Sequence, residues 1–356
     1  MRGLDTSKRP VVFIWELTQA CELSCEHCRA DAQPHRHPDE LSTDEGKQLL
    51  ANVSEFGDGQ LVVLSGGDPC KREDLVELIE YGTDLGLSMT LTPSGTDALT
   101  EEIIEDLADA GLKRIALSID GPDPDSHDAF RGESGSFEQT MRAAKAASDA
   151  GLPLQINTTV CQRTVEGLPA LRTLVADLNA VLWSVFFLVP VGRGRVLDPI
   201  SPERSDDVMS WLGTVVDEED FALKTTEAPH YRRVMAQEEN EGGKRRGGVI
   251  AGDGFAFVSH TGEMYPSGFL PESVGNVKET DPVDLYRNSE LFERLRDRDQ
   301  LEGKCGACPF RSICGGSRSR AYAYTGNPLA SDPLCPFVPE EYDGPLPDQE
   351  LPMPGD

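Results

Sequence analysis

The feature that most constrains this chain is a regular alternation of short apolar runs with longer amphipathic segments, which continues as far as Leu188. Runs rich in β-branched residues predict strands, and amphipathic segments of 10–15 residues predict helices. The expected strands are Val11–Leu17, Leu61–Ser65, Ser88–Thr92, Arg114–Ser118, Leu154–Thr158 and Trp183–Leu188. The expected helices are Thr43–Phe56, Glu73–Leu85, Thr100–Ala110, Phe137–Ala150 and Gly167–Leu178. This order predicts an α/β fold with a parallel sheet and right-handed crossovers.

Local signals support these boundaries. Ser42 followed by Glu45 has the spacing of a capping box, and Thr100 precedes two glutamates as an N-cap would. In parallel sheets of this kind, ligands bind at the carboxyl ends of the strands. Residues just after each expected strand are therefore the first candidates for a functional site.

The chain divides into four expected parts. Its 356 residues are many for one domain, and the alternation stops after about residue 220. We expect a first domain over 1–225, a polar linker over 226–253, a small domain over 254–338 and a Pro-rich, acidic, disordered tail over 339–356. Within the small domain, a hairpin over 254–267 precedes one helix, about Asp284–Arg296.

Charge limits the possible partners. A net charge of −29 excludes nucleic-acid backbone as a main ligand, because phosphates need a basic footprint. Acidic residues spread over the whole chain fit a surface adapted to high salt, and an ordinary acidic protein is the alternative. The sequence has neither an apolar stretch of membrane-spanning length nor the layout of a signal peptide, so we expect a cytoplasmic protein with no membrane partner.

Three of the nine cysteines lie directly after the first expected strand. Cys21, Cys25 and Cys28 have the spacing C-x3-C-x2-C. Three thiolates suit a [4Fe–4S] cluster with one iron left open for another ligand. His27 either supplies a fourth ligand or places an aromatic ring beside the cluster. A zinc site is the other alternative, although structural zinc usually has four protein ligands.

This motif, at this place in a β/α array, resembles that of the radical S-adenosylmethionine (SAM) superfamily. The resemblance implies a partial (β/α)6 barrel with a small C-terminal iron–sulfur domain. It also implies that SAM chelates the open iron through its amino and carboxylate groups. An electron from the cluster then cleaves SAM to methionine and a 5′-deoxyadenosyl radical, which abstracts hydrogen from the substrate.

Residues at the ends of later strands resemble the family's SAM contacts. Gly66, Gly67 and Asp68 resemble a Gly-Gly-Glu motif whose backbone binds the SAM amino group, with Asp here in place of Glu. The remaining candidates for SAM binding are Ser118, Asp120, Arg131, Asn157 and Val189. A surface position at a helix end is the alternative for Arg131, and a structural role is the alternative for Asn157.

Four further cysteines gather near the C-terminus. They are Cys305, Cys308, Cys314 and Cys335. Four thiolates close a [4Fe–4S] cluster completely, and zinc is the alternative. The spacing resembles part of the SPASM extension, but Ser267, and Ser317 with Arg318, stand where further cysteines are expected. We therefore expect a reduced extension of the Twitch type, with one auxiliary cluster that transfers electrons.

The two remaining cysteines carry weaker expectations. Cys161 is expected to be a small buried residue. Cys70 follows the Gly-Gly-Asp-Pro turn, so its role stays open.

The segment from Cys308 to Cys335 narrows the substrate. It resembles the ending of radical SAM enzymes of heme and heme d1 biosynthesis, which act on carboxylate side chains of tetrapyrroles. It also resembles peptide-modifying SPASM maturases, and other small-molecule chemistry is a third possibility. Basic residues that could pair with an anionic substrate bunch at Arg193 and Arg195, at 230–233 and at 244–246, or else balance local acids. We expect a reduced ferredoxin or flavodoxin as the electron donor.

Overall fold

A computed structural model describes residues 5–238, 249–348 and 351. Strands are β1 Val12–Glu16, β2 Leu61–Ser65, β3 Ser88–Leu91, β4 Arg114–Ser118, β5 Leu154–Val160, β6 Leu182–Phe187, β7 Ala222–Thr226, β8 Phe255–Val258 and β9 Met264–Tyr265. Helices are α1 Thr43–Ser54, α2 Leu75–Asp84, α3 Glu101–Asp109, α4 Pro124–Arg131, α5 Ser136–Asp149, α6 Leu168–Asp177, α7 Pro202–Glu218, α8 Tyr231–Glu238, α9 Pro282–Asn288, α10 Glu290–Arg296, α11 Gly303–Gly306 and α12 Arg318–Thr325.

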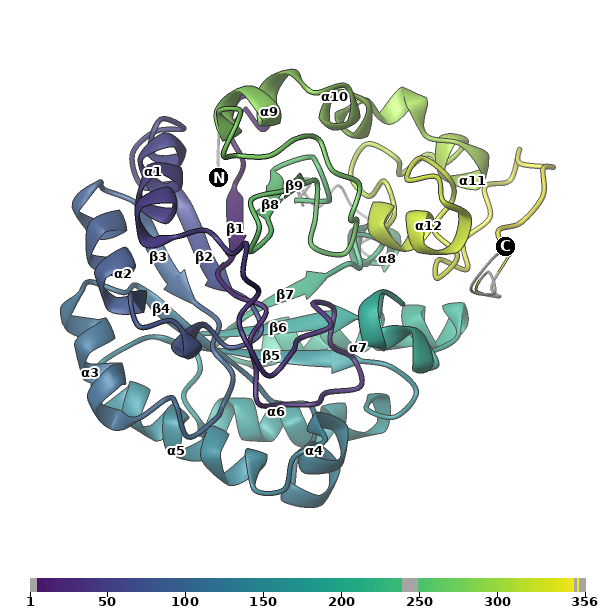
Figure 1. Ribbon diagram of the computed structural model, residues 1–356. Coiled ribbons are helices and arrows are strands. Elements are labelled where there is room, and N and C mark those ends of the chain that lie inside the picture. Colours follow the sequence, from purple (N-terminus) through teal and green to yellow (C-terminus); the bar gives the residue numbers. More distant parts are fainter. Residues whose placement is uncertain (1–4, 239–248, 349–350, 352–356) are drawn as a thin grey trace.

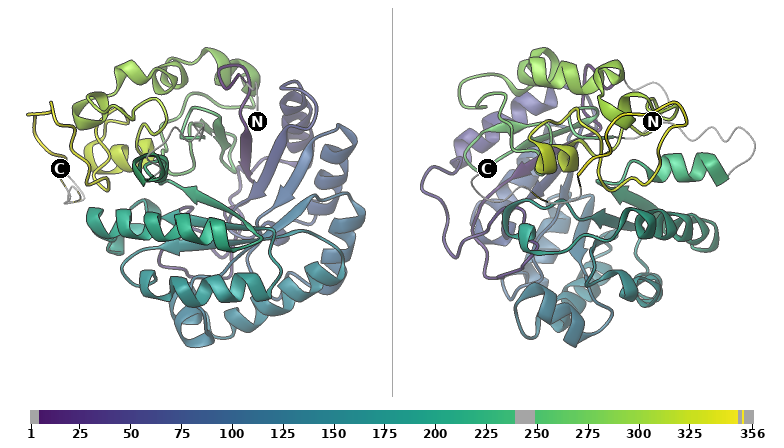
Figure 2. Two further views of the ribbon diagram at one scale, coloured as in Figure 1. Left: turned by 180° about the vertical axis from the view of Figure 1, so that it is seen from behind. Right: turned by 90° about the vertical axis from the view of Figure 1, so that its right-hand side faces the viewer.

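The strands form one curled sheet in the order β7-β6-β5-β4-β3-β2-β1-β8-β9. Strands β1 to β8 run parallel, and β9 turns back antiparallel to β8. Helices cover the outside of this partial barrel, and Figure 2 shows the same arrangement from behind. The α/β partial-barrel prediction is confirmed. The connection between β1 and α1, purple in Figure 1, passes across the middle of the curled sheet.

The expected start signals act as helix caps. Ser42 and Glu45 form a reciprocal capping box at α1, and the Thr100 side chain accepts a hydrogen bond from Ile103 N. Trp15 of β1 is fully buried against α1. A Cβ at Gly46 would lie 2.4 Å from the Trp15 ring, so glycine lets α1 approach the sheet closely.

The expectation that the alternation stops after about residue 220 was wrong by one strand. Strand β7 pairs in parallel with β6. Its sequence Ala-Leu-Lys-Thr-Thr lacks the apolar run of the other strands, because Lys224 and Thr226 point into the barrel. Helices α4 and α7 are also additional to those expected.

The single helix expected over Asp284–Arg296 is two helices. Ser289 has an extended backbone (φ −76°, ψ 138°) and separates α9 from α10. The Arg296 guanidinium donates to the carbonyl of Tyr286, 2.5 Å away, and so satisfies an acceptor that the break releases.

The expected hairpin over 254–267 is present as β8 and β9, and β8 lies beside β1 in the barrel sheet. Helix α8 occupies part of the expected linker, whose residues 239–248 lie outside the described residues. Residues 339–348 of the expected tail have no helix or strand, while 349–350 and 352–356 also lie outside the described part. The division into domains stays a prediction. Within the described residues, no helix is long and apolar enough to cross a membrane.

Candidate functional site

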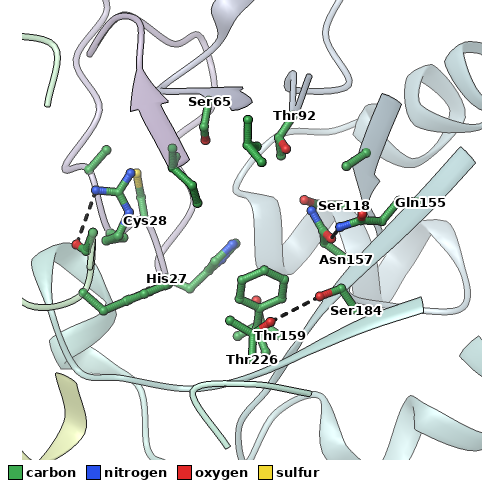
Figure 3. Close-up of a pocket in the computed structure, with 18 of the residues that line it drawn as sticks. His27, Cys28, Ser65, Thr92, Ser118, Gln155, Asn157, Thr159, Ser184 and Thr226 are labelled. Atoms are coloured by element: carbon green, nitrogen blue, oxygen red, sulfur yellow. Dashed lines mark hydrogen bonds between the residues drawn. The ribbon is translucent and has the colours of Figure 1, made fainter. Parts of the chain in front are cut away.

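A cavity of about 560 Å³ fills the inside of the barrel. The predicted site residues that line it are Cys21, Cys25, Cys28, Gly66, Gly67, Ser118, Arg131, Asn157 and Val189. Figure 3 shows polar side chains from several strands pointing into the same space, including Ser118, Asn157 and Ser184. The barrel therefore brings together residues that are up to 168 positions apart in sequence. Asp68 and Asp120 are not among the lining residues.

The cysteine loop presents three thiols to this cavity. Cys21 Sγ accepts a hydrogen bond from Leu23 N, and Cys28 Sγ accepts one from Ala32 N, each at 3.4 Å. Burial raises the pKa of the Cys21 and Cys25 thiols, so these thiolates need a positive partner. The described residues that line the cavity include no fourth cysteine.

The two glycines after β2 hold the cysteine loop. Gly67 N donates to Thr18 O at 2.8 Å, and a Cβ on Gly67 would lie only 2.3 Å from Ala20 O. Gly66 has a φ of +154°, and a Cβ there would lie 2.6 Å from Thr18 O. Any side chain would push away the segment that leads into Cys21, so glycine is required at both positions.

The Asp68 carboxylate is used inside the protein. It accepts hydrogen bonds from Thr96 Oγ1 at 2.7 Å and from the backbone N–H groups of Cys70 and Ser94. Burial raises its pKa. These bonds fix the loop after β3, where Ser94 Oγ lies 3.5 Å from Cys21 Sγ. The sequence reading missed Ser94, although its place just after a strand was a usable signal.

Asp120 and Arg131 form a buried ion pair beside the cysteines. Arg131 Nη2 lies 2.5 Å from Asp120 Oδ2, and Arg131 Nη1 lies 3.9 Å from Cys25 Sγ. Burial opposes ionisation of Asp120, but the charge of Arg131, together with His27 and a hydrogen bond from Thr159 N, lowers the Asp120 pKa. Arg131 Nε is buried without a hydrogen-bond partner. The alternative of a surface arginine is wrong, because the Arg131 side chain is 11% exposed.

His27 lies between this ion pair and an aromatic ring. Its imidazole stacks on Phe130, with centroids 4.5 Å apart and planes 14° apart. Burial lowers its pKa to about 4, so the ring is neutral at pH 7. This placement matches the aromatic role expected for position 27.

The loop after β6 packs on the cysteine loop. Arg193 donates from Nε to Cys25 O at 2.9 Å and from Nη1 to Ala32 O at 2.8 Å. Arg195 is exposed, and 244–246 lie outside the described residues. Arg193, expected as a partner for substrate, therefore holds the cysteine loop instead.

The four C-terminal cysteines line a separate, smaller pocket together with Arg233 and Lys304. Burial raises the pKa of Cys314 to about 12 and that of Cys335 to about 11. Gly316 N donates to Cys314 Sγ at 3.4 Å. Arg233 also forms an ion pair with Asp206 at 2.5 Å. The donor set is four thiols surrounded by N–H groups and cations, which fits an anionic iron–sulfur cluster.

The comparisons with known proteins agree with this geometry. Residues 15–166 match the Radical SAM superfamily. The AdoMet-dependent heme synthase of Methanosarcina barkeri is 41% identical over 341 residues, which cover 93% of this chain and 97% of that protein. This chain belongs to the radical SAM superfamily.

More distant relatives share the radical SAM architecture. The PqqA peptide cyclase of Rhizobium meliloti is 31% identical and covers 94% of this chain and 89% of its own length. SuiB of Streptococcus suis, solved with S-adenosylmethionine, has a TM-score of 0.74 and 16% identity, covering 93% of this chain and 78% of SuiB. That likeness shows the fold alone. The family establishes a SAM-dependent enzyme with a [4Fe–4S] cluster.

The residues that line the cavity fit these radical SAM cofactors. Three thiols on one cavity wall suit a cluster with an open iron, and the free Nε of Arg131 is available to a carboxylate. In the described part of the chain, no three His, Cys, Asp or Glu side chains are spaced for a single metal ion. A cubane attaches each thiolate to a different iron, so its ligands need not meet at one point.

Ser267 and Ser317 stand where further cysteines were expected, and together with Ser319 they contact one carboxylate. Ser267, Ser317 and Ser319 donate from Oγ to the carboxylate of Glu227 at 3.2, 2.5 and 2.9 Å. Glu227 has a φ of +54° and lines the main cavity. Hydrogen bonds to the Glu227 carboxylate thus connect the segment after β9 with the start of α12. The Twitch assignment itself stays a prediction.

The two isolated cysteines differ in their surroundings. Cys161 is 1% exposed and packs with Phe130, Leu188 and Leu197, which confirms the expectation of a small buried residue. Cys70 is half-buried, and burial raises its pKa.

Proposed function

We propose that this radical SAM enzyme oxidatively decarboxylates propionate side chains of an iron-containing tetrapyrrole and leaves vinyl groups, as a heme synthase. The observation that carries the proposal is the 41% identity to a heme synthase along 93% of the chain. A second relative with that name, from Nitratidesulfovibrio vulgaris, covers 94% of this chain at 39% identity.

Cys21, Cys25 and Cys28 are the proposed ligands of the cluster that, with SAM, supplies a 5′-deoxyadenosyl radical. Gly66, Gly67, Ser118 and Arg131 are the proposed SAM contacts, with Asn157 in the middle of β5 and Val189 just after β6. Asp68 and Asp120 are assigned positioning roles, because their carboxylates hold the Ser94 loop and Arg131.

The proposed reaction balances as follows. One hydrogen atom leaves the propionate carbon next to the ring. The resulting substrate radical loses CO2 and one electron, and the two side-chain carbons become a vinyl group. The electron needs an acceptor, and we propose an auxiliary [4Fe–4S] cluster on Cys305, Cys308, Cys314 and Cys335.

The start of α8 links the two sites. Arg232 lines the main cavity, and its Nη1 donates to Ile313 O at 3.0 Å, next to Cys314. Arg233, the next residue, lines the second pocket. This connection supports an electron path from the substrate cavity to the auxiliary site.

The test is anaerobic reconstitution followed by incubation with SAM, reductant and iron-coproporphyrin III. Mass spectrometry should show loss of CO2 and two hydrogen atoms per reacting side chain, together with 5′-deoxyadenosine. If 5′-deoxyadenosine forms and the porphyrin mass stays unchanged, the heme-synthase proposal is wrong. Peptide modification is the alternative proposal, and the similarity to PqqA peptide cyclase favours it. A mass change in a precursor peptide under the same conditions would support that alternative.

The remaining proposals concern the cell rather than the site. We propose a cytoplasmic enzyme that receives its electrons from reduced ferredoxin or flavodoxin. We also propose that the acidic surface is adapted to high salt, because a net charge of −29 repels itself in dilute buffer. The melting temperature should therefore fall when KCl is removed, and an unchanged value would contradict the adaptation to salt.

A further inference from the structure

The lining of the main cavity has a charge opposite to that of the whole protein. Six arginines and lysines line it, and Glu227 is the single acidic residue among the described lining residues. The Glu227 carboxylate is already occupied by three serine hydroxyls. Because the chain has a net charge of −29, this excess of positive charge in the cavity favours binding of an anion.

Four of these six cations are already engaged. Arg29 pairs with Glu16 at 2.7 Å, and Arg131 pairs with Asp120. Arg193 donates to backbone carbonyls of the cysteine loop. Arg232 donates to Ile313 O and Val249 O. Each of these four therefore has a structural partner.

Arg114 and Lys224 are different. Across residues 5–238 and 249–348, neither side chain has an intramolecular hydrogen bond or ion pair among the contacts of the structure. Arg114 begins β4, and Lys224 lies in the middle of β7. Burial, together with the nearby positive charge of Arg114, lowers the pKa of Lys224 to about 8, while Glu227 opposes the shift. Two like charges held near one another in a cavity need a shared anion.

The neighbours of both cations on the sheet are neutral. The register places Lys224 beside Ser184, which is beside Asn157 on β5. Arg114 lies beside Thr90 on β3, which is beside Val63. Neither row offers a carboxylate from the protein.

Arg114 lies away from the predicted SAM contacts along its strand, whereas Lys224 shares a register row with Asn157 and Ser118. Arg114 precedes Ser118 by four residues on the same strand, which is about 13 Å along the barrel at 3.3 Å per residue. The predicted SAM contacts and the cysteines lie at the carboxyl ends of the strands. Lys224 on β7 stands three strands across the sheet from Ser118 on β4, so an anion that contacts both Arg114 and Lys224 is a second group from the one that binds Arg131.

We propose that Arg114 and Lys224 form a carboxylate-binding subsite that anchors a non-reacting propionate of the tetrapyrrole and so orients the ring toward the SAM site. This inference rests on the proposed function. A tetrapyrrole with several propionates places one carboxylate at the reacting end of the cavity and another at the far end. The anchor determines which side chain lies near the SAM site.

The test compares the reconstituted holoenzyme with Arg114→Gln, Lys224→Gln and Lys224→Arg. The matched control is Lys113→Gln, since Lys113 is exposed next to Arg114. The probes are iron-coproporphyrin III and its tetramethyl ester, with binding followed by absorbance. Each Gln variant should bind the free acid about tenfold more weakly. Binding of the ester should stay unchanged, and Lys224→Arg and Lys113→Gln should bind like wild type.

Two further readouts separate this role from others. Removing an unpaired buried cation should raise the melting temperature of Lys224→Gln by about 2 °C, whereas loss of a structural contact would lower it. SAM affinity should be retained, and a weaker SAM affinity would assign the cations to SAM instead. If wild type decarboxylates the porphyrin and the Gln variants bind the acid as tightly as wild type, the subsite is wrong. If wild type does not bind the porphyrin, the proposed function fails first.

Discussion

The two groups of cysteines lie in opposite kinds of surroundings. Cys21, Cys25 and Cys28 line one wall of a cavity of about 560 Å³ with many other side chains. The C-terminal four share a small pocket among themselves, and its cation Arg233 is paired with Asp206. The first site has one ligand too few for a closed cluster, whereas the second has a full set. The difference supports our proposal that substrate and SAM bind at the first site and that the second site transfers electrons.

The largest expected effect is complete loss of SAM cleavage in Cys21→Ala. A cluster that has lost one of three thiolates cannot hold and reduce SAM. Formation of 5′-deoxyadenosine, measured by chromatography, should fall below detection. Cys161→Ala is the control, because that buried thiol packs only against apolar side chains and a threonine. Normal SAM cleavage by Cys21→Ala would contradict the assignment of SAM to the first cysteine group.

A smaller effect is expected for Asp120→Asn. The change removes the charge that pairs with Arg131, so the guanidinium next to Cys25 loses its orientation. Affinity for SAM, measured by equilibrium dialysis, should fall about tenfold. The control is Asp123→Asn, which keeps an N-cap side chain on the same loop. Unchanged SAM affinity in Asp120→Asn would show that Arg131 does not depend on this pair.

A pH series tests whether the charge of Lys224 contributes to substrate binding in the main cavity. Lys224, with a pKa lowered to about 8 by burial and by Arg114, loses its charge as the pH rises through 8, and Glu227 is the acidic group beside it. Binding of iron-coproporphyrin III should weaken by about tenfold in total as the pH rises through 8, the same loss as in Lys224→Gln. Lys224→Arg should remove this dependence, because arginine stays charged. The same pH profile in both proteins would exclude Lys224 as the titrating group.

The smallest expected effect is a twofold fall in iron content on Cys314→Ala. Reconstituted wild type should contain about eight irons per chain, and Cys314→Ala should contain about four. Colorimetric iron determination, with circular dichroism to confirm folding, is sufficient. About four irons in wild type would remove the second cluster from the account.

The sequence predicted the parts of the molecule that depend on local pattern. Apolar strands such as Leu61–Ser65, the cap at Ser42 and the parallel sheet follow from periodicity and local hydrogen bonding, whereas the partial barrel was implied by the resemblance to the radical SAM superfamily. Strand β7 was missed because its inward side chains, Lys224 and Thr226, are polar. A strand that lines a cavity does not carry the pattern of one that fills a core.

The residues of the site divide in the same way. The cysteine spacing and the glycine pair are local signals, and the structure places them on the cavity. Which cations are free is a tertiary property. Arg193 lies in a basic stretch yet binds carbonyls, whereas Arg114 and Lys224 are far apart in sequence and come near one another only in the folded barrel.

The most direct test of the division between the sites is a product count with Cys314→Ala. The folded variant, with its remaining iron verified, is incubated with SAM, reductant and iron-coproporphyrin III, and 5′-deoxyadenosine and vinyl product are both quantified. The account predicts that SAM cleavage continues while vinyl product falls far below the wild-type ratio. Vinyl product at the wild-type ratio, or loss of SAM cleavage, would contradict separate roles for the open and the closed site.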